Sequence, residues 1–330
     1  MKEIRFSVII PAFNASHTIE RCLSSLTRQS VKKEDYEIII VDDGSIDGTS
    51  DIVNQFPVKY LWQTNQGPAS ARNKGVKEAE GEIVLFTDAD CVPQHNWIEE
   101  MVKFFDNLEV TAVKGVYKTS QKSLVARFAQ IEFEERFEML KKSDGIDMVD
   151  TYSAAYRKSI FLSLGGFDPS FPVANNEDTE LSYRMSQAGY KMVFNPNAIV
   201  YHLNHPDSLI KYARNKFWRG YWRMVVYKRY PYKMLKDSYT PQTLKLQVLF
   251  LFLFIICLPL TWLYSYQIFS LLIFVFFAYL FSVLPFSTLA YKIDHTIGIL
   301  SPFFLCLRAA SLGSGVVWGI MSFTCQFKRR

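Results

Sequence analysis

The sequence predicts an α/β fold, with a Rossmann-like, mostly parallel sheet and helices on both faces, followed by a C-terminal transmembrane helical region. Two observations support this prediction. A strand pattern alternates with a helix pattern four times before residue 87, with connections too long for hairpins, as is typical of parallel sheets. Further on, the 46 consecutive residues 246–291 contain no Asp, Glu, Lys, Arg or His, which is enough for two membrane spans of about 20 residues each.

The first strand is the β-branched run 6–10, which Pro11 ends. Ser16 is expected to cap a helix that extends to residue 29, with apolar residues at helical spacing. Each of the first four strands should deliver its following loop to the same edge of the sheet. The next strands are expected at 38–41, 58–62 and 83–86, and the helices between them at 47–54 and 65–80.

Beyond residue 90 the alternation is less regular. The string Gly165-Gly166-Phe167-Asp168-Pro169 predicts a turn. On the helix expected at 124–140, Glu132, Glu134, Glu135 and Glu138 predict a mainly solvated face. Further helices are expected at 97–105 and 178–188, and strands at 111–117 and 199–201.

Charge is distributed unevenly along the 330 residues. Residues 1–205 hold 22 basic and 29 acidic side chains, whereas residues 206–242 hold nine basic and two acidic ones. A basic segment beside a membrane span marks the cytoplasmic side and is attracted to anionic head groups. Nucleic acid is the rival partner for such a segment, but it does not account for the apolar run that follows. We therefore expect a membrane and no nucleic acid, with the α/β domain on the cytoplasmic side of a multi-pass membrane protein.

Three regions follow from this pattern: an α/β domain at 1–205, basic amphipathic interfacial or linker helices at 206–242, and a transmembrane region of two to three helices at 243–330. The basic helix is rich in aromatic residues, as expected at a membrane interface, although an ordinary surface helix with an aromatic core face has the same pattern. The expected spans are Leu246–Leu263 and Ile268–Phe286. A third candidate, Ile297–Phe327, is interrupted by Pro302 and Arg308, and it either spans, re-enters or lies in the interface.

Small residues in that third candidate suit close packing between helices. The five cysteines are scattered and have no metal-ligand spacing, so neither a disulfide framework nor a zinc site is expected.

Carboxylates follow two of the predicted buried strands. Asp88 and Asp90 come directly after the strand 83–86, and Asp42 and Asp43 come after the strand 38–41. Two aspartates one residue apart can bind one hard cation through oxygen ligands at the carboxyl edge of the sheet. An acidic turn without a ligand is the alternative for either pair.

Five strings, taken in order, resemble the successive signatures of family 2 glycosyltransferases with the GT-A fold. The resemblance covers residues 4–205 and implies inverting transfer of a sugar from a nucleotide-diphospho-sugar, assisted by Mg²⁺ or Mn²⁺. The strings are Ser7-Val-Ile-Ile-Pro-Ala-Phe-Asn14, Val41-Asp-Asp-Gly-Ser-Ile-Asp-Gly-Thr49, Asn65-Gln-Gly-Pro-Ala-Ser-Ala-Arg-Asn-Lys-Gly75, Asp88-Ala-Asp90 and Asn176-Glu-Asp-Thr-Glu-Leu181.

The resemblance implies a role for each matched position. Asp90, ahead of Asp88, is the direct metal ligand, and His202 resembles a histidine that completes the metal shell in part of the family, with a structural histidine as the alternative. Asp43, or its neighbour Asp42, accepts a hydrogen bond from the nucleotide base. The remaining donor-site expectations are Pro11, Ala12 and Asn14 around the base and ribose, and Gly67 and Arg72 near the phosphates or sugar, with a surface ion pair as the alternative for Arg72.

Asp178 matches the position of the family's catalytic base, with Glu177 as the second choice and a helix cap as the alternative role. The motif Gln-x-x-Arg-Trp of the processive members is replaced here by Arg214-Asn-Lys-Phe-Trp-Arg219. We therefore expect transfer of a single sugar to a lipid-linked or membrane-proximal acceptor, hydroxyl or phosphate. A polyprenyl phosphate acceptor is the narrower hypothesis, and a catalytically silent nucleotide-sugar-binding scaffold is the alternative from another class.

Overall fold

The computed structural model describes residues 4–261 and 265–327. The chain divides into two compact units. The first runs to Ser120 and includes Phe137–His205, and the second comprises Gln121–Arg136 together with the residues from Pro206 onward. The second unit therefore contains a helical segment from the middle of the sequence as well as the C-terminal helices.

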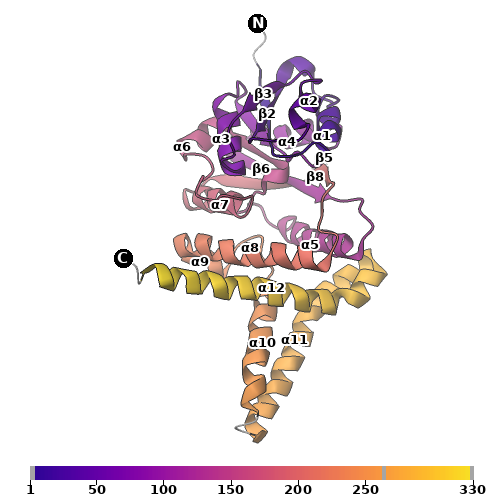
Figure 1. Ribbon diagram of the computed structural model, residues 1–330, viewed down its shortest axis with the longest axis vertical. Helices are drawn as coiled ribbons and strands as arrows, with labels where there is room; N and C mark the ends of the chain where they lie inside the picture. The colour runs from indigo at the N-terminus through magenta and orange to yellow at the C-terminus, as the bar shows by residue number, and fades with distance from the viewer. Residues whose placement is uncertain (1–3, 262–264, 328–330) are drawn as a thin grey trace. The chain divides into compact units, whose positions relative to one another are not determined.

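The first unit is built on an eight-stranded mixed sheet with the strand order β3-β2-β1-β4-β7-β6-β8-β5 (Figure 1). Strand β1 lies between β2 and β4 and is parallel to both, and β3 extends this parallel half at the edge. The antiparallel pairs are β4 with β7, β6 with β7 and β5 with β8. The strands are β1 (Phe6–Ala12), β2 (Tyr36–Asp42), β3 (Lys59–Trp62), β4 (Ile83–Phe86), β5 (Cys91–Pro93), β6 (Val110–Lys118), β7 (Ala154–Arg157) and β8 (Lys191–His202).

The four predicted parallel strands are confirmed, and β4 has the predicted bounds. Two strands were not predicted: β5 is three residues long, and β7, Ala-Ala-Tyr-Arg, lacks a β-branched run. Strand β8 begins at Lys191, well before the predicted start at residue 199. Asn195 and Pro196 interrupt its apolar pattern, and the register of β8 against β6 shifts between Phe194 and Ile199, the stretch that contains them.

The helices of this unit agree with the prediction in number and order up to residue 106, but the predicted cap at Ser16 is wrong. Helix α1 begins after Thr18, and the Ser16 amide instead donates to Asp47 in the next loop (3.1 Å). The helices are α1 (Ile19–Leu26), α2 (Thr49–Val53), α3 (Pro68–Lys77), α4 (Trp97–Val102), α6 (Lys158–Ser163) and α7 (Glu177–Gln187), with 3-10 turns η1 (Lys33–Asp35), η2 (Lys103–Asp106) and η3 (Thr151–Ser153).

An aromatic cluster supports the sheet beneath the acidic loop that follows β4. Phe86, the last residue of β4, contacts Tyr156, Phe161 and Phe167 with ring centroids 5.4 to 5.8 Å apart. Offset and edge-to-face aromatic pairs of this kind add to the free energy of apolar burial. The strand end that precedes Asp88 is therefore held in a rigid setting.

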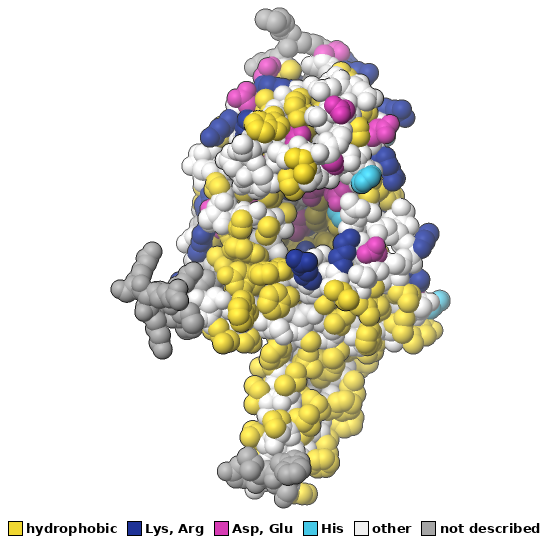
Figure 2. Space-filling view, viewed as in Figure 1, with side chains coloured by type: hydrophobic (Ala, Val, Ile, Leu, Met, Phe, Trp, Pro, Cys, Tyr) yellow, Lys and Arg dark blue, Asp and Glu magenta, His cyan; other side chains and the backbone are white. Residues whose placement is uncertain are grey.

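The second unit consists of helices. Its members are residues 121–136 of α5 (Leu124–Leu140), then α8 (Leu209–Arg229), α9 (Pro231–Leu235), α10 (Gln242–Leu260), α11 (Ser265–Ile293) and α12 (His295–Phe327). Helices α10 and α11 lie side by side, and hydrophobic side chains cover the face of this pair seen in Figure 2. Helix α12 lies along α8 and across the α10–α11 pair (Figure 1). Leu263, the predicted end of the first span, is outside the described residues.

Glycines allow α8 and α12 to approach closely. A Cβ at Gly315 would lie 1.9 Å from the carbonyl oxygen of Phe217, and a Cβ at Gly220 would lie 2.2 Å from that of Leu312. The small residues predicted to serve helix packing thus pack α12 against α8. By length and composition, Gln242–Leu260, Tyr266–Ile293 and His295–Ser322 could each cross a membrane.

The predicted solvated face of α5 is wrong at Glu132. The Glu132 side chain is 1% exposed and accepts hydrogen bonds from Lys216, Tyr212 and Arg308, at 3.0 to 3.2 Å. Arg308 also donates to Gln247 of α10 (2.7 Å). Glu132 therefore holds α5 to α8 and α12, and the same face of α5 buries Phe128 against Phe286 and Phe304.

Candidate active site

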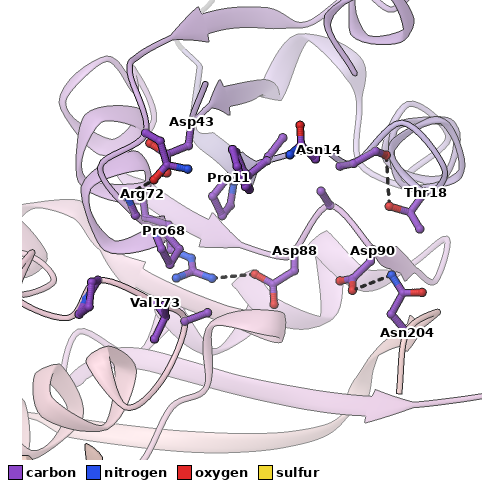
Figure 3. A pocket seen from close by; sticks show the side chains of 18 of the residues that line it. Pro11, Asn14, Thr18, Asp43, Pro68, Arg72, Asp88, Asp90, Val173 and Asn204 are labelled. Atoms are coloured by element: carbon purple, nitrogen blue, oxygen red, sulfur yellow. Dashed lines mark hydrogen bonds and ion pairs between the residues drawn. The ribbon is translucent and has the colours of Figure 1, made fainter. Parts of the chain in front are cut away.

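A cavity of about 600 Å³ opens at the carboxyl ends of β1, β2 and β4. Ligands bind at this edge in open α/β sheets, and the volume lies within the usual range for small-molecule sites. Figure 3 shows Asp43 and Asp90 on different sides of the cavity, with Asp88 between Arg72 and Asp90.

The loop after β1 is tied to the loop after β2 through Asn14. Its amide donates to the Ser45 hydroxyl (2.9 Å), and its side-chain oxygen accepts from the Ile46 amide (3.0 Å). Asn14 has a φ of 49°, in the left-handed region that asparagine tolerates better than most residues. Two hydrogen bonds thus maintain an uncommon backbone conformation at the cavity wall.

The two neighbouring aspartates after β2 differ in their surroundings. Asp42 is 1% exposed and accepts from the Ser45 amide (2.7 Å) and the Tyr60 hydroxyl (2.8 Å), and it is not among the cavity-lining residues. Asp43 lines the cavity, where its carboxylate accepts from the Gln66 amide (2.9 Å) and the Gly67 amide (2.8 Å). Asp42 shapes the turn, and Asp43 is the acid of this pair that lines the cavity.

Helix α3 begins at the cavity with Gly67 as its N-cap and Pro68 at its first position. Gly67 has a φ of 88°, and a Cβ there would lie 3.0 Å from the carbonyl oxygen of Pro172. A residue with a side chain would thus be strained in its backbone and would press on the segment that forms the opposite wall.

Arg72 lies one turn into α3 and is 2% exposed. Its guanidinium donates to Asp88 (2.7 Å) and to Glu177 (2.9 Å), and so joins the loop after β4 to the start of α7. Burial opposes the charge of Arg72, but the carboxylates of Asp88 and Glu177 hold its pKa above the ordinary value. The alternative of a surface ion pair is therefore excluded, since this ion pair is buried.

Asp90 is grouped with His202 rather than with Asp88. A carboxylate oxygen of Asp90, an imidazole nitrogen of His202 and the sulfur of Cys91 lie within 4.8 Å of one another. Burial raises the pKa of the Cys91 thiol, so the oxygen of Asp90 and the nitrogen of His202 are the donors of this group that fit a divalent cation. His202 Nε2 is 3.2 Å from Asp90 Oδ2, and Asn204 donates to the same oxygen (3.3 Å; Figure 3). Burial alone would raise the pKa of Asp90, but the hydrogen bonds from His202 and Asn204 hold it below its ordinary value.

Helix α7 begins at Glu177, after Asn176 with a φ of 68°. Glu177 is 2% exposed and bonded to Arg72 and to the Asn175 amide (2.6 Å). Its burial, and next the charge of Asp178, raise the pKa of Glu177 to about 7, against the influence of Arg72. Asp178 is half-buried and accepts from the Thr179 amide (2.7 Å). Glu177 therefore anchors α7, and Asp178 is the more accessible acid.

The turn Gly165–Asp168 is fixed by one side chain of α3. Asn73 Nδ2 donates to the Phe167 carbonyl (2.7 Å), and the Phe167 amide donates back to Asn73 Oδ1 (2.9 Å). A Cβ at Gly166, whose φ is 69°, would lie 2.5 Å from Asn73 Oδ1. Both glycines have positive φ, which explains the pair in the sequence.

Most of the residues predicted for the donor and metal sites line this one cavity, whereas Asp42, Glu177 and Asp178 do not. Sequence reasoning missed several lining residues that carry no local motif, because the fold brings them there from separate loops. The predicted lining residues are Pro11, Ala12, Asn14, Asp43, Gly67, Arg72, Asp88, Asp90 and His202, and the missed ones include Thr18, Pro172, Val173 and Asn204.

Residues 7–165 match the family described as Glycosyl transferase family 2. The chain carries a family 2 glycosyltransferase domain. This result confirms the predicted family and the predicted class of enzyme, and the match includes Asp43, Arg72 and Asp90.

Curated relatives are also named as glycosyltransferases. The transferase chain is 29% identical over 206 residues to Glycosyltransferase AglE of Haloferax volcanii, covering 61% of this chain and 67% of that protein. It is 32% identical over 244 residues to the probable glycosyltransferase YdaM of Bacillus subtilis, covering 68% of this chain and 54% of that protein. The chain therefore spans from about half to two thirds of the length of these two relatives.

The solved structure of the mannosyltransferase PcManGT from Pyrobaculum calidifontis, in complex with GDP-Man and Mn²⁺, is similar to the transferase chain with a TM-score of 0.60. The sequence identity is 18%, and the likeness covers 97% of this chain and 88% of that one. At this identity the likeness shows the fold, and it confirms the predicted GT-A architecture. The long apolar C-terminal helices are seen in this chain itself.

Proposed function

We propose that this glycosyltransferase moves a single sugar from a nucleotide-diphospho-sugar to a lipid-linked or membrane-proximal acceptor, with inversion and with assistance from a divalent cation. The observation that carries the proposal is that one cavity of about 600 Å³ is lined by Asp43 and by the Asp90–His202 pair, with Asp43 and Asp90 on different sides. An elongated ligand with a hydrogen-bonding base and a diphosphate fits this separation of groups.

Each end of the cavity suits one part of such a donor. Asp43 is positioned to accept a hydrogen bond from an imide N–H of the base, since its carboxylate lines the cavity while its other bonds come from backbone amides and Gln63. Pro11, Ala12 and Asn14 line the wall beside it. Mg²⁺ or Mn²⁺ suits Asp90, Asp88 and His202 as ligands, and such a cation supplies charge neutralisation for a departing diphosphate.

Asp178 is proposed as the base that takes the proton of the acceptor hydroxyl. An inverting displacement needs a carboxylate on the face opposite the leaving group. Glu177 is the poorer candidate, because its carboxylate is buried and bonded to Arg72 and the Asn175 amide. Arg72 then links the proposed leaving-group side of the site to the proposed base, since it contacts both Asp88 and Glu177, the residue that precedes Asp178.

The helical unit supports a membrane-proximal acceptor. Helices α10 and α11 leave most of their apolar surface exposed, with 17% and 22% of the spanning windows buried. We propose that this pair spans the bilayer, that α8 and α12 lie in its cytoplasmic interface, and that the transferase domain is cytoplasmic. A polyprenyl phosphate is the narrower candidate acceptor. Arg308 supports the interfacial placement of α12, because its guanidinium is paired with Glu132 and Gln247.

The test uses the full chain purified in detergent, with two measurements. Thermal stabilisation by UDP, GDP and dTDP sugars, each with Mn²⁺ and with EDTA, identifies the donor as the nucleotide sugar that raises Tm in a metal-dependent manner. Sugar transfer is then compared for Asp178→Asn and for the exposed control Asp106→Asn. We expect Asp178→Asn to keep the donor-induced shift and to lose at least ~100-fold in transfer rate. Near-normal turnover in Asp178→Asn would remove Asp178 as the base.

A further inference from the structure

Two side chains outside the predicted site surround the imidazole of His202. His202 is the last residue of β8, and its Nε2 lies 3.2 Å from Asp90 Oδ2. Its backbone carbonyl accepts from the Thr119 hydroxyl (3.1 Å), and the next amide, that of Leu203, donates to the Asp90 carbonyl (2.9 Å). The backbone at this point is therefore fixed to the Asp90 loop, and the remaining freedom of His202 is the rotation of its ring.

His205 limits that rotation from one side. It is 1% exposed, and its Nδ1 lies 3.1 Å from His202 Nδ1, within hydrogen-bond distance. The Asn204 backbone amide donates to Nδ1 of His202 (3.3 Å). The Nδ1 edge of the His202 ring thus contacts this turn, and the Nε2 edge faces the carboxylate of Asp90.

Tyr117 of β6 limits the ring from its face. Its ring centroid lies 4.6 Å from that of His202, with the two ring planes inclined by 41°, and 4.7 Å from that of His205, with an inclination of 26°. Tyr117 is 8% exposed and is itself backed by the ring of Tyr152 at 4.4 Å. A ring flip of His202 would therefore require an aromatic wall to move.

We propose that His205 and Tyr117 are positioning residues, which hold the His202 imidazole with Nε2 directed at the cation bound by Asp90. This inference rests on the proposed function, which gives His202 a place in the metal shell. Histidine ligands are commonly fixed through the ring nitrogen that does not bind the metal, and the loss of such a partner typically lowers metal affinity by about 10- to 100-fold. His205 follows His202 by three residues, a spacing that no sequence motif singled out.

The test measures Mn²⁺ binding directly, by EPR titration of the full chain in detergent without donor, and measures ¹⁴N coupling to the bound Mn²⁺ by pulsed EPR. His205→Leu is expected to weaken Mn²⁺ binding by about 10-fold or more and to reduce the ¹⁴N signal. His205→Asn, whose side-chain oxygen can take the place of Nδ1, and Tyr117→Phe, which keeps the ring, should retain affinity within about 3-fold. His205→Gln, whose polar group lies too far along the side chain, should resemble His205→Leu.

Two controls separate this inference from the proposed function. His295→Ala, in the helical unit, should leave Mn²⁺ binding unchanged, and His202→Ala should remove the ¹⁴N signal. If His202→Ala binds Mn²⁺ with the affinity and ¹⁴N signal of the parent, the metal role of His202 fails. If His202→Ala loses affinity while His205→Leu and His205→Gln both keep it, the positioning role of His205 is overturned and the metal site stands.

Discussion

Arg72 offers the sharpest test of how the site is held together. Its guanidinium is buried between Asp88 and Glu177, and Glu177 is also buried, with a side chain 3% exposed. Replacement of Arg72 by Met keeps the volume but leaves the Glu177 carboxylate without its cation. Breaking one partner of a buried ion pair costs about 3–5 kcal/mol. In a domain of this size, that loss corresponds to a fall in Tm on the order of 10 °C.

A double-mutant cycle separates the ion pair from simple packing. We expect Arg72→Met to be strongly destabilising and the double variant Arg72→Met with Glu177→Gln to recover at least half of the loss, because no charge then remains buried. Transfer should stay low in the double variant, since Asp88 and the start of α7 are no longer joined. The matched control is Lys59→Met, whose ion pair with Glu78 is 3.5 Å long and half-exposed, and which should change stability by less than about 1 kcal/mol.

The measurements are thermal unfolding of the full chain in detergent, with and without donor, and the rate of sugar transfer. A fall in Tm for Arg72→Met no larger than that for Lys59→Met would show that the Arg72 bridge is solvated and would refute the reasoning. Strictly additive effects of Arg72→Met and Glu177→Gln would refute it as well, because two partners in one buried contact must be coupled.

Three further outcomes are expected. Burial would raise the pKa of Glu132, but Lys216 and Arg308 lower it to about 2 from 4.5. The stabilising contribution of Glu132 is therefore present above pH 4.5 and is lost as the pH falls toward 2, and thermal unfolding should show a loss of about 1 kcal/mol by pH 4. A Glu132→Gln variant with the same acid dependence as the parent would contradict this. Gly315→Leu should separate α8 from α12, because a Cβ at Gly315 would lie 1.9 Å from the Phe217 carbonyl oxygen. Circular dichroism should show a lower Tm for this variant. The control Gly48→Ala, at an exposed position with nothing within 4 Å of its Cβ, should leave Tm unchanged. Asp43→Ala should abolish the donor-induced thermal shift, since it removes both the base contact and the acceptor of the Gln66 and Gly67 amides, and an unchanged shift would place the base elsewhere.

Strands β1, β2 and β4 could be predicted because their centres are continuous apolar runs, and such runs are typical of strands buried on both faces. Strand β7 could not, because Ala154 and Ala155 owe their place to the antiparallel pairing with β4 and β6 rather than to their own propensity. The preference of serine for helix N-caps also gave a wrong prediction at Ser16, because its amide donates to Asp47 and helix α1 begins after Thr18. Local sequence patterns thus predict the strands that are apolar throughout, whereas the other strands form because of their pairing with neighbouring strands.

The same distinction applies to the site. Asp43, Asp88 and Asp90 follow strands, so their common location was predictable from the sheet topology. The contact of Arg72 with Glu177 joins residues 105 positions apart, and no local pattern in the sequence predicts it. Glu132 was predicted to be solvated because its helix carries four acids, but its partners Lys216 and Arg308 lie 84 and 176 positions away.

The buried face of α5 sets a condition for making a soluble form of this enzyme. Phe128 is fully buried, and its ring stacks on Phe304 at 4.6 Å. Deletion of residues 243–330 alone would therefore expose an aromatic surface on α5 and would remove Arg308, one of the hydrogen-bond donors to the Glu132 carboxylate. A soluble transferase should require polar replacements on α5, at Phe128 and Ile131 above all, in addition to removal of the C-terminal helices. The boundary between the transferase unit and the helical unit thus passes through α5, near the middle of the sequence, as well as through the start of the C-terminal helices.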